Sequence, residues 1–203
     1  MGYLNYDNSF SLIVARWPWL CSIGQFFRLW GSRQSAYISF ARQHAIRHAN
    51  ATKRIPLEDK SVSVIYTSHM CEHLSRAEFD EFLAECRRLL ATEGVLRVVV
   101  PDLRSFVDSY LENGDADRFI ESLDIATVHD RVASRAGRLR FLVFGFREHK
   151  WMYDANSLVR KLKQAGFQRV MVLRPGETTI LEPGNLDLRE REENSVYVEA
   201  TIR

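Results

Sequence analysis

The stretch from residue 61 to residue 102 constrains the fold most, because it predicts a strand, a helix and a second strand in succession. Residues 62–67, Val-Ser-Val-Ile-Tyr-Thr, form a β-branched and aromatic run that is too short for a buried helix. Ser75 followed by Glu78 is a capping box, and it opens a pattern of apolar residues three and four positions apart. Residues 95–100, Val-Leu-Arg-Val-Val-Val, predict a second and more hydrophobic strand.

The two predicted strands are expected to lie parallel in one sheet, because a helical crossover of this length joins them. We expect the helix between them to end at Gly94 in the left-handed conformation. The carboxyl ends of both strands then share one edge, where open α/β sheets bind ligands. The polar residues that the sequence places at this edge are Ser68, His69, Glu72, His73 and Asp102. A ligand site is therefore predicted there.

The length and charge of the chain narrow the class of protein. Its 203 residues are enough for one domain with its own core, and we expect residues 1–203 to form a single domain. The 28 basic and 26 acidic residues leave a formal net charge of +2, which gives no reason to expect nucleic-acid binding. The three cysteines lack CxxC spacing, which favours a reduced, cytoplasmic protein.

The most apolar segment, residues 9–30, is too interrupted to cross a membrane. Arg16, Pro18 and Arg28 break it, whereas a bilayer span needs roughly 20 predominantly apolar residues. Stable membrane insertion is therefore not expected. Helices that are apolar on nearly every side must still be covered. The sequence leaves open whether they form core or a lid, bind a partner chain or a second copy as a homodimer, or lie on a membrane surface.

The rest of the chain continues the α/β pattern. Further strands are predicted at residues 3–6, 45–48, 169–173 and 195–202, and further helices around residues 106–111, 119–126 and 154–165. The last strand alternates apolar and polar residues, which favours an antiparallel strand near a sheet edge. Residues 129–150 are rich in arginine, and these side chains either form a solvated surface or line a site for an anionic substrate.

Several motifs together resemble the class I S-adenosylmethionine-dependent methyltransferases, in particular their small bacterial type-11-like group. The motifs are Leu-Asn-Tyr-Asp-Asn-Ser at residues 4–9, Ile-Pro-Leu-Glu-Asp-Lys-Ser at 55–61, Ser-His-Met-Cys-Glu-His-Leu at 68–74, Leu-Leu-Ala-Thr-Glu-Gly-Val-Leu-Arg at 89–97 and His-Lys-Trp-Met-Tyr-Asp at 149–154. The resemblance implies an α/β, Rossmann-like, doubly wound and mostly parallel sheet with a late antiparallel strand. In that fold the cofactor, S-adenosyl-L-methionine, binds at the carboxyl edge.

The resemblance also implies roles for individual residues. Asp7 would accept the ribose hydroxyls, Asn50 and Ala51 would take the adenine side, and Ser68 and His69 would border the transferable methyl group. The residue types alone allow simpler roles. Asp7 equally suits a cap for the next helix, and Asn50 suits a turn that serves its own backbone.

One departure from the family concerns the front of the fold. The family begins with a strand and a glycine-rich turn that holds the amino-acid end of the cofactor, and no pair of glycines in this sequence has that spacing. We therefore expect an N-terminally truncated domain that lacks the first strand, whose place is filled by a partner chain, by residues 3–6 or by a collapsed gap. Losing two or three hydrogen bonds of about 1.5–3 kcal/mol each predicts weaker cofactor binding.

The predicted catalytic residues are His69, Glu72 and His73. A histidine has the right proton affinity to take a proton from a methyl acceptor, and Glu72 would orient it. The alternative is that both histidines only satisfy backbone groups at a strand end and a helix start. The His-x-x-Glu-His spacing also matches a zinc-protease pattern, but that pattern needs both histidines on one helical face, so no metal ligand is predicted.

The sequence thus predicts an enzyme, an S-adenosylmethionine-dependent methyltransferase that acts on a small-molecule or anionic acceptor. The alternative is a non-catalytic, methyltransferase-like binding or partner subunit that has lost the glycine loop.

Overall fold

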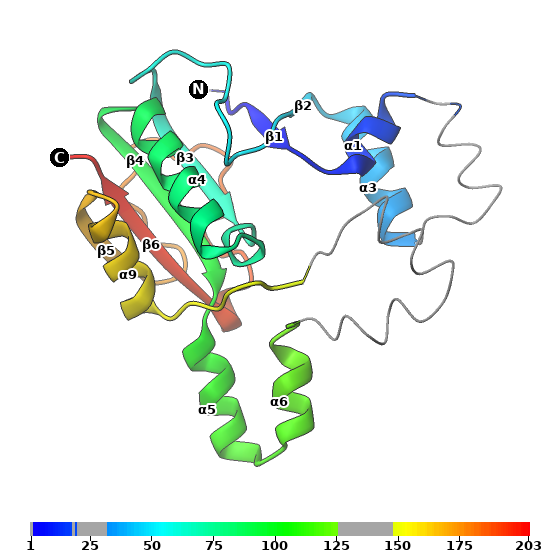
Figure 1. Ribbon diagram of the computed structural model, residues 1–203, viewed down its shortest axis with the longest axis vertical. Helices are drawn as coiled ribbons and strands as arrows, with labels where there is room; N and C mark the ends of the chain where they lie inside the picture. The colour runs from blue at the N-terminus through cyan, green and yellow to red at the C-terminus, as the bar shows by residue number, and fades with distance from the viewer. Residues whose placement is uncertain (1, 18, 20–31, 126–147) are drawn as a thin grey trace. The chain divides into compact units, whose positions relative to one another are not determined.

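The computed structural model describes residues 2–17, 19, 32–125 and 148–203, which fall into two compact units (Figure 1). Unit 1 comprises Met1–Ile55 and Thr127–Arg147, and unit 2 comprises Pro56–Ala126 and Glu148–Arg203. Most of the apolar segment 9–30 beyond residue 17, and all the arginines from Arg131 to Arg147, lie outside the described residues.

Unit 1 contains a small parallel sheet and two helices. Its elements are β1 (Asn5–Asp7), α1 (Phe10–Ala15), α3 (Ser32–Gln43) and β2 (Ile46–His48). β1 and β2 pair in parallel, with Asp7 opposite His48, and both short strands were predicted from the sequence. The two helices bury a common apolar cluster made of Leu12, Val14, Ala15, Ile38 and Ala41.

Unit 2 is built on a four-stranded sheet. Its strands are β3 (Val62–Ser68), β4 (Leu90–Pro101), β5 (Gln168–Leu173) and β6 (Ser195–Thr201), in the order β3-β4-β6-β5. β3 and β4 are parallel, and β6 is antiparallel to both of its neighbours. β3, β4 and β5 therefore run in one direction and the last strand in the other. The predicted Rossmann-like α/β fold with a late antiparallel strand is confirmed.

The position predicted for the last strand near an edge is wrong. β6 lies between β4 and β5, and its five central residues are buried. The alternation that suggested an edge includes Glu199, which is only 1% exposed. This carboxylate is buried because Arg97 of β4 pairs with it across the strands, with 2.6 Å between Nη1 and Oε1.

Helices cover one face of this sheet. α4 (Arg76–Leu89) and α9 (Ala155–Gln164) lie on the same side in Figure 1, and an ion pair of 2.5 Å joins Lys161 to Asp80. Ser75 and Glu78 form the predicted capping box of α4. On the other face, Arg97 donates to the carbonyl oxygens of Glu177 and Leu188, so the segment between β5 and β6 packs there.

Gly94 does not end the helix, contrary to the prediction. α4 passes directly into β4, because Leu90 already has an extended backbone conformation. A glycine is nevertheless required at position 94 for space. A Cβ atom there would lie 3.0 Å from the carbonyl oxygens of both Ala91 and Val62. The glycine therefore permits close approach of β3 and β4 rather than a turn.

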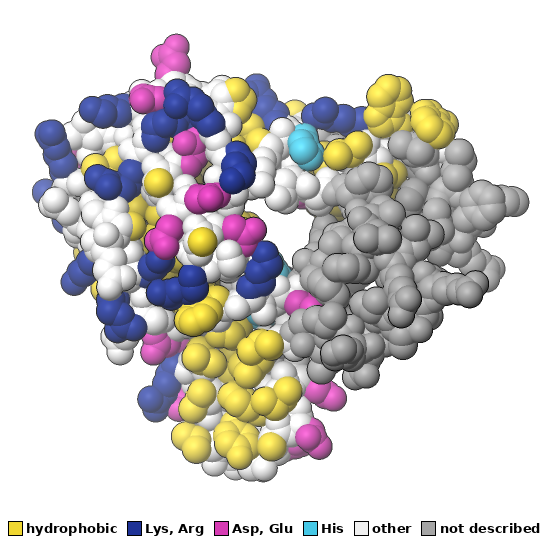
Figure 2. All heavy atoms as spheres, in the orientation of Figure 1, with side chains coloured by type: hydrophobic (Ala, Val, Ile, Leu, Met, Phe, Trp, Pro, Cys, Tyr) yellow, Lys and Arg dark blue, Asp and Glu magenta, His cyan; other side chains and the backbone are white. Residues whose placement is uncertain are grey.

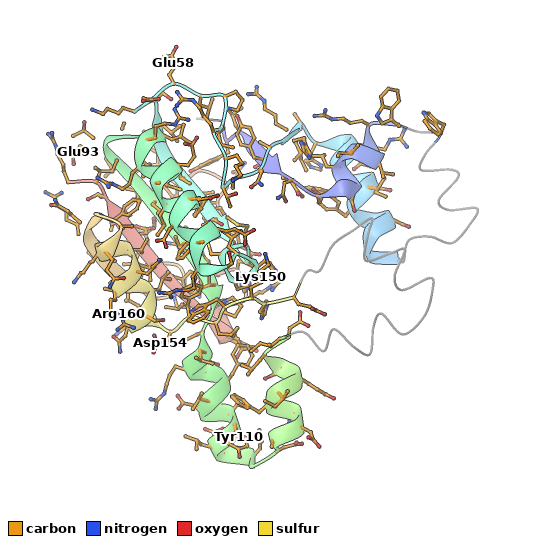
Figure 3. The ribbon with its side chains drawn as sticks, viewed as in Figure 1. Glu58, Glu93, Tyr110, Lys150, Asp154 and Arg160 are labelled. Atoms are coloured by element: carbon orange, nitrogen blue, oxygen red, sulfur yellow. The ribbon has the colours of Figure 1, made fainter. Side chains whose placement is uncertain are left out.

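Two helices follow β4. α5 (Leu103–Asn113) and α6 (Ala116–Ser122) are joined at Gly114, which has a φ of 68°, and the rings of Tyr110 and Phe119 lie 5.1 Å apart between them (Figure 3). Hydrophobic side chains gather on the surface of these helices (Figure 2). Among the helices that the structure describes, none has the length and apolar character needed to cross a bilayer.

Candidate functional site

The carboxyl ends of β3 and β4 form the centre of the site. The strands are in register, with Ser68 opposite Val99, and the backbone N–H of His69 donates to the carbonyl oxygen of Val99 at 2.9 Å. His69 has a φ of 48°. A non-glycine residue in this left-handed region is uncommon and strained, and such residues cluster at functional sites. The chain thus turns sharply at the end of β3 and directs His69 across the sheet edge.

A short 3₁₀-helix, η1 (Cys71–His73), follows this turn and buries Glu72. The backbone carbonyl of Glu72 accepts hydrogen bonds from the N–H groups of Lys150 and Trp151, at 2.8 and 3.1 Å. The ammonium of Lys150, which is labelled in Figure 3, also pairs with Glu78 of α4 at 2.9 Å. These contacts hold the segment that begins at residue 148 against η1.

The Glu72 carboxylate lies among three imidazoles. Its Oε1 is 3.4 Å from His69 Nδ1, 3.9 Å from His73 Nε2 and 4.0 Å from His149 Nε2. The side chain is 1% exposed, and neither carboxylate oxygen has a hydrogen-bond partner among the described residues. The structure therefore brings together the predicted His69, Glu72 and His73 and adds His149.

His69 is also held from the opposite side by residues far along the chain. Arg191 Nη1 lies 3.1 Å from His69 Nδ1, and His69 Nε2 lies 3.1 Å from Ser195 Oγ. Because a guanidinium has only donors, Nδ1 accepts that hydrogen bond, and in the neutral ring Nε2 carries the proton and donates it to Ser195. Residues 69, 191 and 195 are thus one connected group.

A cavity of about 530 Å³ opens at this edge. It is lined by His69, Pro101, Phe106, Ser122, His149 and Arg191 together with Glu192, Glu193 and Asn194. Its volume lies in the range of small-molecule sites, which is roughly 300–1,000 Å³. The mixture of one aromatic ring, one cation, two carboxylates and two imidazoles suits a polar small molecule.

Two other residues at the edge serve the fold instead. Burial raises the pKa of Asp102, whose carboxylate caps α5 by accepting from the N–H of Arg104 at 3.0 Å. Burial also raises the pKa of the Cys71 thiol, so this cysteine stays protonated and is neither a nucleophile nor a good metal ligand.

The remaining predicted cofactor residues lie in unit 1. The Asp7 carboxylate accepts from the N–H of Ser9 at 2.5 Å and from the Tyr37 hydroxyl. Asn50 Oδ1 accepts from the N–H and the hydroxyl of Thr52, at 2.9 and 3.0 Å, in a turn that includes the half-buried Ala51. Both side chains therefore make the local bonds that their residue types suggested, and their roles toward a cofactor stay predictions.

Sequence reasoning missed His149, Arg191 and Ser195 as site residues. His149 belongs to a motif that had been recognised at residues 149–154, but only the backbone bonds between Glu72 and Lys150 bring its ring to the edge. Arg191 stands in a polar, charged stretch whose composition is typical of solvated loops, and no sequence pattern marks it.

Comparison with known proteins agrees with these observations. A family model described as a methyltransferase domain matches residues 30–98, which include β3, α4 and most of β4. Comparison with curated proteins gives no match.

Solved structures of methyltransferases are similar in fold. One is a SAM-dependent methyltransferase from Thermotoga maritima, described as a possible histamine N-methyltransferase, with 21% identity and a TM-score of 0.46 over 85% of this chain and 70% of that one. Another is a SAM-dependent methyltransferase from Archaeoglobus fulgidus, with 13% identity and a TM-score of 0.43 over 84% of this chain and 72% of that one. The family match agrees with the resemblance seen in the motifs, and it covers residues 30–98.

Proposed function

We propose that this protein is an S-adenosylmethionine-dependent methyltransferase that transfers a methyl group to a small polar or anionic acceptor bound in the cavity at the β3–β4 edge. The family match carries the proposal, because residues 30–98 contain β3, α4 and most of β4, and the carboxyl ends of these two strands form the edge. A strained histidine and a cavity of suitable size at the carboxyl ends of parallel strands support it.

Each unit, taken by itself, supplies polar groups of the kind that this cofactor binds. Asp7 uses two hydrogen-bond acceptor positions for Ser9 and Tyr37, and a carboxylate offers about four, so positions are left for ribose hydroxyls. Ser68 ends β3, and His69 lines the cavity beside it. S-adenosylmethionine supplies a methyl group on a positively charged sulfur, which makes that carbon open to attack.

The protein's part in the reaction is to align the acceptor and receive its proton. When bound, the cofactor would give its methyl group to the acceptor's lone pair and would leave as S-adenosylhomocysteine, with the electron pair of the broken carbon–sulfur bond on sulfur. The acceptor's proton passes to Nδ1 of His69, at the position where the Arg191 guanidinium now donates. The protonated Nδ1 then lies 3.4 Å from the Glu72 carboxylate, which stabilises the imidazolium.

Ligand binding tests the proposal directly. S-adenosylhomocysteine should raise the unfolding temperature of the protein, because a ligand at 100 times its dissociation constant stabilises the native state by about 2.7 kcal/mol. Adenosine without the homocysteine group serves as a weaker-binding comparison. No shift at millimolar S-adenosylhomocysteine would refute cofactor binding and leave a non-catalytic partner subunit as the better description.

A further inference from the structure

The buried Glu72 carboxylate has no hydrogen-bond partner of its own among the described residues, although it is 1% exposed. A buried charge is costly unless it is paired or bound to a metal ion. The groups that face it besides His69 are the Nε2 atoms of His73 and His149. One ligand atom from each of Glu72, His73 and His149 lies within 4.8 Å of the other two.

The backbone fixes which nitrogen of each ring faces Glu72. Nδ1 of His73 lies 3.1 Å from the carbonyl oxygen of Glu148, and Nδ1 of His149 lies 2.7 Å from that of Leu123. A carbonyl oxygen only accepts, so each Nδ1 carries a proton. In the neutral rings, both Nε2 atoms therefore present lone pairs toward the carboxylate. Backbone carbonyls that hold Nδ1–H in this way are typical of metal-binding histidines.

The distances distinguish an ion from a direct hydrogen bond. Nε2 of His73 and of His149 lie 3.9 and 4.0 Å from Glu72 Oε1, beyond the roughly 2.7–3.2 Å of an N–H···O bond. Two bonds to one zinc ion, of about 2.0–2.1 Å to nitrogen and 2.0–2.2 Å to oxygen, together span about 4.0–4.3 Å. Each separation is therefore within the span of two metal–ligand bonds, and a single ion shared by all three residues requires the three atoms to move closer together. Contraction to the tetrahedral separation of about 3.3 Å needs side-chain shifts of under about 1 Å.

We propose that Glu72, His73 and His149 form a binding site for a divalent transition-metal ion, with Zn²⁺ as the best fit. Two imidazoles and one carboxylate suit Zn²⁺, whereas Mg²⁺ and Ca²⁺ prefer oxygen ligands alone. The sequence pattern predicted no metal because it paired His73 with His69. The third ligand is instead His149, from a segment 76 positions after His73 in the sequence.

The metal site adjoins the cavity, because His149 belongs both to the metal cluster and to the cavity wall. Three protein ligands leave one position of a tetrahedral ion open. This part of the inference rests on the proposed function: the open position takes the hydroxyl oxygen of the acceptor and brings it beside His69, so the acceptor class is an alcohol or a phenol.

Metal titration of the full chain tests the site. Zn²⁺ binding, followed by competition with a chromophoric chelator, should show one equivalent, and Co²⁺ should give the visible absorption of a low-symmetry, four-coordinate ion. His73→Ala, His149→Gln and Glu72→Gln should each weaken binding at least tenfold. The glutamine variants keep side chains of similar length, and His149→Gln retains a donor for the Leu123 carbonyl, which guards against loss of the fold.

His44→Ala is the matched control. Nδ1 of His44 also lies at a backbone carbonyl, 2.9 Å from the oxygen of Phe40, but the His44 ring stacks on the Phe40 ring in unit 1 and is not part of the metal cluster. It should bind Zn²⁺ as the wild type does. Absence of a Co²⁺ band in the wild type, or equal affinity of all the variants, would overturn the site. The metal titrations contain no S-adenosylhomocysteine, so they test the metal site independently of the cofactor. If the protein binds Zn²⁺ but S-adenosylhomocysteine does not raise its unfolding temperature, the proposed function is refuted and the metal site stands.

Discussion

Arg97 of β4 and Glu199 of β6 form an ion pair inside the sheet, with 2.6 Å between Nη1 and Oε1 and at most 1% of either side chain exposed. Burial would raise the pKa of Glu199, but the hydrogen bonds from Thr178, Thr179 and Arg97 outweigh it and hold the pKa below its ordinary value. The carboxylate is therefore charged and fully paired in the native state.

Removing one member of this pair should strongly destabilise the protein, because the other charge is then buried without a partner. We expect Arg97→Met to lower the free energy of unfolding in urea by about 3–5 kcal/mol. Asp108→Ala is the control, because it breaks the exposed ion pair with Arg104. It should change the free energy of unfolding by less than about 1 kcal/mol. Equal effects of the two substitutions would show that the buried pair contributes no more than a surface pair.

Stability should fall at acid pH partly through Glu78. The backbone N–H of Ser75, and then the Lys150 ammonium, lower the pKa of Glu78 to about 2. Because the pKa of Glu78 in the folded state lies below its value near 4.3 in the unfolded state, Glu78 stabilises the folded state fully above about pH 4.3. This stabilisation is lost as the pH falls toward 2. Urea midpoints measured between pH 6 and pH 2.5 should decline less steeply in Glu78→Gln than in the wild type. Parallel curves would remove Glu78 from the acid response.

Gly94→Ala should destabilise the sheet, although the backbone angles at this position suit any residue. The added methyl group meets the Val62 carbonyl oxygen at 3.0 Å, and strands β3 and β4 must separate to relieve it. We expect a loss of about 1–3 kcal/mol in the free energy of unfolding. Gly2→Ala is the control, since a Cβ atom there has no neighbour within 4 Å. A neutral Gly94→Ala would mean that the strands adjust freely.

Asp7→Ala should lower the affinity for S-adenosylhomocysteine at least tenfold if the carboxylate binds the ribose hydroxyls. Tyr37→Phe is the matched control, because it removes the hydroxyl that bonds Asp7 and leaves the carboxylate in place. Calorimetry should show a loss of affinity for S-adenosylhomocysteine in Asp7→Ala and none in Tyr37→Phe. Unchanged affinity in Asp7→Ala would leave Asp7 with its local bonds to Ser9 and Tyr37 as its whole role.

The elements with strong local signals were predictable. The capping box at Ser75 and Glu78 and the β-branched run at residues 62–67 each act through neighbours in the chain, so the sequence contains their cause. Parallel pairing of β3 and β4 followed from the length of the crossover. The carboxyl edge that holds His69, Glu72 and His73 was a consequence of that pairing.

The sequence by itself determined the order of strands and helices along the chain. It also determined that polar residues gather at the carboxyl edge of β3 and β4. Tertiary structure alone decided that β6 lies inside the sheet, because its buried Glu199 depends on Arg97, which stands 102 positions away in the sequence. It also decided that His149 and Arg191 join His69 and Glu72, since hydrogen bonds between distant segments bring them together. Local patterns encode secondary structure through nearest neighbours, whereas a site made of distant side chains exists only once the chain has packed.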